Sequence, residues 1–144
     1  MRYSTIVVAV DVNDPIHARA AVTRAAAIVD DAGMLHLLHV RYFLPARYSD
    51  LLADDFDTRE EREAIKAMRG WCAEAGLDES RFRINTRRGR VRDEVIDEAA
   101  RTGADLIVIG SHQPSIGSYL LGSNAAAIIR HSPVSVLVVR AEPK

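Results

Sequence analysis

The chain has 144 residues, one cysteine, a formal net charge of -1 and 48% hydrophobic residues. This length suits one domain, so we predict a single domain over residues 1–144. The balanced charge argues against nucleic acid or a membrane surface as a partner, and no apolar run approaches the ~18 residues of a membrane span. One cysteine excludes an intrachain disulfide and a thiolate metal site. Because no signal peptide is recognisable, we expect a cytoplasmic protein.

Strand-like and helix-like patterns alternate along the first part of the chain. Residues 5–10 form a nearly continuous apolar run, which predicts a strand buried on both faces. Asp14 and Pro15 then predict a helix start, and apolar residues at helical spacing continue to Ala32, with Gly33 as the expected helix end. Residues 34–40 predict the second strand.

The same alternation continues to the end of the chain. Asp57 and Glu60 have the spacing of a capping box, and the helix they begin is expected to end at Gly76. The remaining segments predict an edge strand, a helix, a buried strand, a helix and a final apolar strand, in this order: residues 81–86, 91–103, 105–109, 123–131 and 134–139.

This order of elements predicts the fold class. Five short strands separated by helices indicate an α/β fold, a single doubly wound (Rossmann-like) domain with a five-stranded parallel sheet and helices on both faces. The expected strand order is 3-2-1-4-5. In such sheets ligands bind beyond the carboxyl ends of the strands, where the strand order reverses. Candidate functional residues are therefore those that follow the first and fourth strands.

The segment after the fourth strand is rich in glycine and serine. Gly110 would let the backbone approach a ligand closely. Gly122 and Ser123 precede or begin a helix, whose free N–H groups and dipole favour a phosphate. On spacing alone the alternative stays open that these residues only form a tight turn and a helix cap.

Three stretches resemble the universal stress protein family: residues 6–11, residues 104–123 and residues 129–140. The ATP-binding members carry the pattern G-x2-G-x9-G-[ST]. Gly110, Gly122 and Ser123 match its ends, whereas Gln113 stands at its second glycine and the loop is one residue shorter. The segments Gly-Ser-His-x-Pro and Leu-Leu-Gly-Ser-Asn are similar to an enterobacterial-type subgroup of nucleotide binders.

The resemblance implies a site for an adenine nucleotide: ATP, or else AMP or ADP, with Mg²⁺ as a candidate companion. It places Ala9 and Asp11 near the adenine and ribose, and Val40 beside the adenine. For Asp11 there is an alternative from the residues themselves, because an aspartate at a strand end often binds the turn that follows it.

The resemblance also implies the phosphate side of this site. Ile109 and Gly110 would flank the ribose and phosphates, and Gly122, Ser123 and Asn124 would hold the phosphates. Two further residues lie inside the loop and have no assigned role; they are His112 and Gln113.

No assembled catalytic set is visible, so the pattern favours a binding protein over an enzyme. The chain lacks a P-loop motif and a G-x-S-x-G elbow. We predict a nucleotide-dependent regulatory protein of the stress response. One alternative is a slow ATP hydrolase or a protein that phosphorylates or adenylylates itself. Another is a nucleotide-free interaction module, which Gln113 and the shorter loop would favour.

Partner surfaces are predicted more weakly than the site. The strand over residues 134–139 is apolar and last in the chain, which indicates an edge that needs cover. The resemblance implies that it pairs with its mate in a homodimer, and a further protein partner stays unknown.

The remaining reactive residue types have structural interpretations. His39 is predicted to be a packed or turn-adjacent histidine, and His36 and His131 have no companions at zinc-ligand spacing. Cys72 falls on an apolar helix face, which indicates core packing. The arginines of residues 87–92 are followed by acidic residues, so we expect surface ion pairs.

Overall fold

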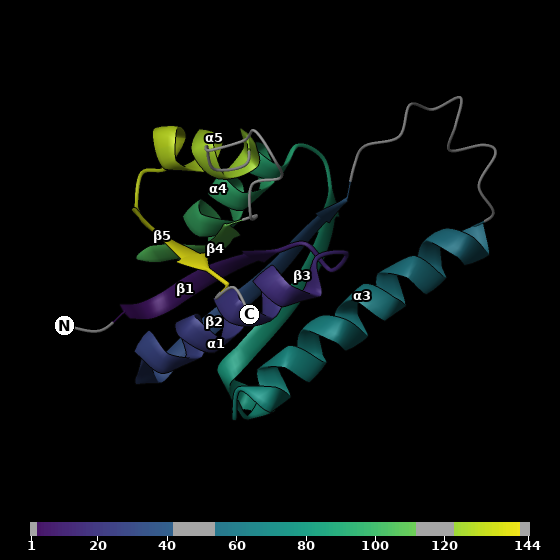
Figure 1. Ribbon diagram of the computed structural model, residues 1–144, viewed down its shortest axis with the longest axis horizontal. Coiled ribbons are helices and arrows are strands. Elements are labelled where there is room, and N and C mark those ends of the chain that lie inside the picture. The colour runs from purple at the N-terminus through teal and green to yellow at the C-terminus, as the bar shows by residue number, and fades with distance from the viewer. Residues whose placement is uncertain (1–2, 42–53, 112–122, 142–144) are drawn as a thin grey trace.

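The computed structural model describes residues 3–41, 54–111 and 123–141, and its centre is a five-stranded parallel sheet (Figure 1). The strand order is β3-β2-β1-β4-β5, as predicted. β1 lies in the middle because its residues are apolar on both faces; Ile6, Val7 and Val8 have no exposed surface. The strands are β1 (Tyr3–Val10), β2 (Val29–Arg41), β3 (Phe82–Arg88), β4 (Leu106–Ser111) and β5 (Ser135–Arg140).

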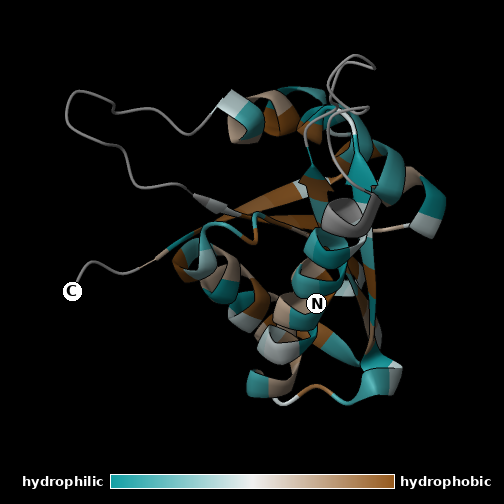
Figure 2. Ribbon diagram, turned by 90° about the vertical axis from the view of Figure 1, so that its right-hand side faces the viewer, coloured by the Kyte–Doolittle hydropathy of each residue, from teal (hydrophilic) through white to brown (hydrophobic). Residues whose placement is uncertain are grey.

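Helices cover both faces of this sheet, which confirms the doubly wound α/β fold. α1 (Pro15–Ile28) and α3 (Asp54–Glu74) pack on one face, and α4 (Val91–Thr102) and α5 (Ser123–His131) on the other (Figure 1). In Figure 2 the strands between the helix layers are mostly hydrophobic, and the helices turn hydrophilic residues outward. Within the part of the chain that the structure describes, no helix is long and apolar enough to cross a membrane.

The boundary between α1 and β2 differs from the prediction. α1 ends at Ile28, not near Ala32, and Val29 already pairs with Tyr3 of β1. The next pair is Thr5 with Met34, so two residues of β1 lie opposite five residues of β2, and the pairing is irregular over this stretch. A Cβ on Gly33 would lie 2.7 Å from the carbonyl oxygen of Ser4. Gly33 is therefore required by close packing of two strands, not by a helix end.

α3 starts earlier than the sequence predicts. It begins at Asp54, so Asp57 lies inside the helix and the predicted capping box does not mark its start. The expected buried face is present: Ala64, Met68 and Cys72 lie in the core beneath α3. Cys72 has no exposed surface, which confirms its packing role, and this burial raises the pKa of its thiol to about 12.

A buried charged cluster joins α4 to β3. Glu98 of α4 is 1% exposed, and its carboxylate accepts hydrogen bonds from Arg87 at 2.8 Å, Arg101 at 3.0 Å and Asn85 at 3.1 Å. The predicted surface ion pairing of the arginine cluster is confirmed for Arg92, which contacts Asp93 at 3.0 Å, but it is wrong for Arg87, whose partner Glu98 is buried. These bonds hold the second half of α4 against the sheet, whereas the first half, with Val91 and Val95, lines the candidate site.

Hydrogen bonds to a second carboxylate join the start of β4 to β1. The carboxylate of Asp105, one residue before β4, accepts hydrogen bonds from the backbone N–H groups of Ser4 at 3.0 Å and Thr5 at 3.1 Å. Partial burial opposes ionisation of this carboxyl, but the hydrogen bonds outweigh it, and the pKa of Asp105 lies below its ordinary value.

Candidate functional site

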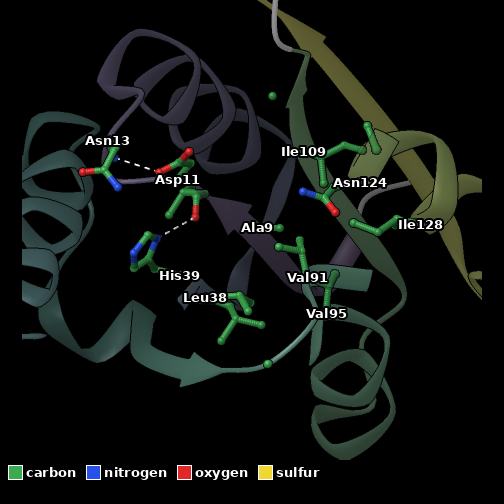
Figure 3. A pocket seen from close by; sticks show the side chains of 15 residues that line it. Ala9, Asp11, Asn13, Leu38, His39, Val91, Val95, Ile109, Asn124 and Ile128 are labelled. Atoms are coloured by element: carbon green, nitrogen blue, oxygen red, sulfur yellow. Dashed lines mark hydrogen bonds between the residues drawn. The ribbon is translucent and has the colours of Figure 1, made fainter. Parts of the chain in front are cut away.

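Two adjoining hollows open at the carboxyl ends of β1, β2 and β4, and Figure 3 shows the first of them. The first has a volume of about 210 Å³ and the second about 260 Å³. They meet at Ala9, Asp11, Gly110 and Asn124, which line both. This is where the strand order reverses, between β1 and β4, so the structure brings the site to the predicted edge of the sheet.

Part of the wall of the first hollow is apolar. Leu38 and Val40 of β2 and Ile109 of β4 line it. Val91 and Val95 of α4 and Ile128 of α5 also line it (Figure 3). The predicted residues Ala9, Val40 and Ile109 are thus brought together. A wall of this kind accepts a flat apolar ring, with polar groups at the rim setting its orientation.

Val91, Val95 and Ile128 are not among the predicted site residues. Each lies in a predicted helix, and helical periodicity does not show that a helix face borders a cavity. One signal was available: Gly89 and Val91 follow an edge strand, and the carboxyl ends of parallel strands share one edge of the sheet.

Asp11 lies at the mouth of both hollows and organises the turn that leads into α1. Its side-chain oxygen Oδ1 accepts a hydrogen bond from the N–H of Asn13 at 2.9 Å, and its carbonyl accepts from the N–H of Asp14 at 3.0 Å. The turn-binding interpretation is therefore observed. Since Asp11 is exposed and also lines both hollows, the ribose contact that the resemblance implies stays a prediction.

His39 is buried beside the same turn, as predicted. Only 6% of it is exposed, and its Nδ1 lies 3.3 Å from both the N–H of Val12 and the carbonyl oxygen of Val10. One nitrogen can serve only one of these partners at a time, because the first requires a lone pair and the second a proton. His39 therefore ties β2 to the end of β1 and forms part of the first hollow (Figure 3).

Gly110 has a structural reason that the sequence did not show. A Cβ at this position would lie 2.7 Å from the carbonyl oxygen of His17 and 3.1 Å from its carbonyl carbon. The first turn of α1 thus packs directly on the end of β4. Gly110 also lines both hollows. A side chain at this position would therefore both clash with α1 and project beside the hollows.

The phosphate side of the predicted site is described only in part. Ser123 and Asn124 form the first turn of α5, and both line the second hollow. The predicted residues His112, Gln113 and Gly122 lie outside the described residues.

Asp14 and His17 also line the second hollow; Asp14 was predicted only as a helix start, and His17 was not predicted. Nδ1 of His17 lies 2.8 Å from Oδ1 of Asp14, and the two side chains are only 14% and 20% exposed. Their spacing of three residues at a helix start is the signal that could have found them. Among the residues that the structure describes, no cluster of three or more His, Cys, Asp or Glu side chains could hold a metal ion.

Comparison with known proteins identifies the family. The sequence matches the universal stress protein family over residues 2–140. The chain belongs to this family. Universal stress protein G of Escherichia coli O157:H7 is 42% identical over 144 residues, an alignment that covers 96% of this chain and 99% of that one.

Solved structures of other universal stress proteins have the same fold. UspA from Lactobacillus plantarum superposes with a TM-score of 0.78 at 26% identity, over 97% of this chain and 99% of that one. A universal stress protein in complex with cAMP gives a TM-score of 0.70 at 24% identity, over 99% and 100%. The Archaeoglobus fulgidus protein in complex with dAMP gives 0.62 at 22% identity, over 96% and 99%.

Proposed function

We propose that this universal stress protein binds an adenine nucleotide in the two hollows and acts as a nucleotide-dependent regulatory module of the stress response. The observation that carries the proposal is a pair of joined hollows at the point where the strand order reverses: aliphatic side chains from β2, β4, α4 and α5 line the first, and the starts of α1 and α5 line the second. The cAMP and dAMP complexes of proteins with the same fold support it. ATP is the nucleotide implied by the glycine pattern, with Mg²⁺ as its candidate companion.

The two hollows divide the nucleotide between them. The adenine would lie in the apolar slot between Val40 and Ile109, with Ala9 beneath it. The ribose would reach Asp11, which borders both hollows, and the phosphates would reach the start of α5 at Ser123 and Asn124. There the free N–H groups and the dipole of the helix favour negative charge.

The connection from the site to a partner surface runs through α5. Its first turn lines the second hollow, and its end at His131 leads to β5 at the edge of the sheet. We propose that β5, predicted as the strand over residues 134–139, pairs with a second copy of the chain. Val136, Leu137 and Val138 are half-buried there, and strand pairing would cover them. Light scattering over a dilution series tests this; a constant mass of one chain would contradict it.

A released-nucleotide assay tests the main proposal most directly. The purified protein is denatured, and the supernatant is analysed for AMP, ADP and ATP by chromatography and mass spectrometry. Calorimetry with added nucleotide then measures affinity. Absence of any bound nucleotide, together with no binding at millimolar concentration, would refute the proposal.

A cavity-filling variant tests the location. Ala9→Leu places a larger side chain at the base of the adenine slot (Figure 3). We expect affinity to fall about tenfold or more, since overpacking a filled slot costs ~1–3 kcal/mol. Ala27→Leu makes the same change on the exposed side of α1 and serves as the control. Equal affinities for the two variants would contradict the proposed adenine position.

A further inference from the structure

We propose that His17 is the phosphate-sensing residue of this site, taking up a proton when the phosphate of a nucleotide enters the second hollow. The inference rests on the proposed nucleotide function. It assigns a role to the charge of His17, which neither the fold nor the glycine pattern indicates. It follows from the charges that surround the hollow.

Among the described residues, no Lys or Arg side chain lines either hollow, whereas Asp11 lines both and Asp14 lines the second. Arg90 and Arg92 line a separate hollow on the α4 side, which shares no residue with the second hollow except Asn124. Residues 110–129, which include the glycine loop, contain no Lys, Arg, Asp or Glu. A phosphate held by neutral donors would therefore face two carboxylates, and like charges in a partly buried site repel strongly.

His17 can remove part of this repulsion. Its ring is mostly buried, and Nδ1 lies 2.8 Å from Oδ1 of Asp14. In the neutral ring, Nδ1–H donates to the carboxylate, so Nε2 is the nitrogen that gains a proton. With that proton, the pair formed by Asp14 and His17 changes from a net charge of about -1 to about 0, which makes the hollow more favourable for an anion.

The position of His17 connects it with the phosphate end of the site. It lines the second hollow together with Ser123 and Asn124, the first turn of α5, across from its own helix α1. Its backbone is fixed there, because the carbonyl group of His17 packs against Gly110 at the end of β4. The proton and the phosphate therefore meet in the hollow between two helix starts.

The other charged and titratable groups around His17 can be named for each neighbouring element. The turn before α1 contributes Asp11 and Asp14, and β2 contributes His39 in the adjoining hollow. Gly110 of β4 and the first turn of α5 contribute no charge. On β5, Arg140 follows Val139, which packs on the α1 side, so alternation along the strand places Arg140 on the opposite face.

The experiment measures binding of adenosine, cyclic AMP and AMP by calorimetry, without divalent ions, at about pH 6 and about pH 8. Cyclic AMP is the decisive ligand because its phosphodiester does not titrate in this range, so any pH dependence comes from the protein. For the wild type we expect cyclic AMP to bind about fivefold tighter at the lower pH, with net proton uptake in buffers of different ionisation enthalpy. Adenosine, which has no phosphate, should bind with little pH dependence.

His17→Gln should abolish both the pH dependence and the proton uptake for cyclic AMP, while adenosine still binds as in the wild type. Retained adenosine binding shows that the variant is folded. His131→Gln changes an exposed histidine at the far end of α5 and is the matched control. Asp14→Asn is the second variant; it removes the carboxylate that lies 2.8 Å from Nδ1 of His17, and we expect it to reduce the proton uptake.

The outcomes separate the two proposals. If His17→Gln retains the pH dependence and the proton uptake of the wild type, the role of His17 is refuted and nucleotide binding stands. If none of the three ligands binds the wild-type protein at millimolar concentration, the proposed function fails and the role of His17 fails with it.

Discussion

Replacing Gly110 with alanine separates a packing role from a ligand-binding role at this position. The added Cβ would lie 2.7 Å from the carbonyl oxygen of His17 and 3.1 Å from its carbonyl carbon. Both atoms belong to the backbone of the first turn of α1, so no side-chain rotation can relieve the contact. Either α1 or the end of β4 must shift by several tenths of an ångström. Overpacking of this kind costs ~1–3 kcal/mol, so we expect the free energy of unfolding to fall by that amount without any ligand.

Gly70→Ala is the matched control. Gly70 is an exposed residue away from the ends of α3, and nothing lies within 4 Å of a Cβ added there. Alanine is favoured over glycine inside a helix by ~0.5–1 kcal/mol, so this variant should be more stable than the wild type. Urea unfolding followed by far-UV circular dichroism measures both changes.

For a chain of this length, about 1 kcal/mol corresponds to roughly 3–4 °C in Tm, so thermal unfolding also resolves them. If Gly110→Ala is as stable as the wild type in the absence of nucleotide, the close approach of α1 and β4 is refuted. Gly110 would then be explained by ligand access alone.

Three further predictions concern packing and charge elsewhere in the fold. Glu98→Gln should lower the free energy of unfolding by about 3 kcal/mol in urea unfolding, because the partly buried guanidinium of Arg87 loses its charged partner. Glu74→Gln, at an exposed ion pair, should change it by less than about 1 kcal/mol, and equal effects would contradict this account. Cys72, whose pKa burial raises to about 12, should not react with a thiol reagent at about pH 8 until urea unfolds the protein; rapid labelling of the native state would show an open core. Asp105→Asn should destabilise the protein at neutral pH; since the folded-state pKa of Asp105 is lowered, its contribution is present above the unfolded pKa of ~3.9 and is lost as pH falls. Unfolding measured from about pH 7 to pH 3 should show the two proteins converging at acid pH, and a constant difference would refute the linkage.

Local patterns predicted the elements and their order well. The apolar run of β1 and the alternation of β3 indicated a central and an edge strand, and the structure places them so. The end of α4 at Gly103 was also correct, because a left-handed residue, here at φ 68°, is favoured only for glycine. These features depend on neighbours in sequence, and local physics decides them.

The helix boundaries that failed depend on distant partners. Val29 continues the apolar spacing of α1, but it belongs to β2 and pairs with Tyr3, the first residue of β1. Gly33 marks a helix end in the local pattern, whereas a Cβ there would meet the backbone of Ser4. Periodicity along the chain contains no information about which strand lies alongside, so it cannot decide between these outcomes.

For the site, the sequence by itself determined the edge of the sheet and the residues at the strand ends, because parallel strands place their carboxyl ends together. Only the tertiary structure showed that Val91 and Ile128 complete the apolar slot and that Asp14 and His17 line the second hollow. A cavity is defined by surfaces from several elements at once. Its shape and charge therefore depend on how α1, α4 and α5 pack, which no single stretch of sequence specifies.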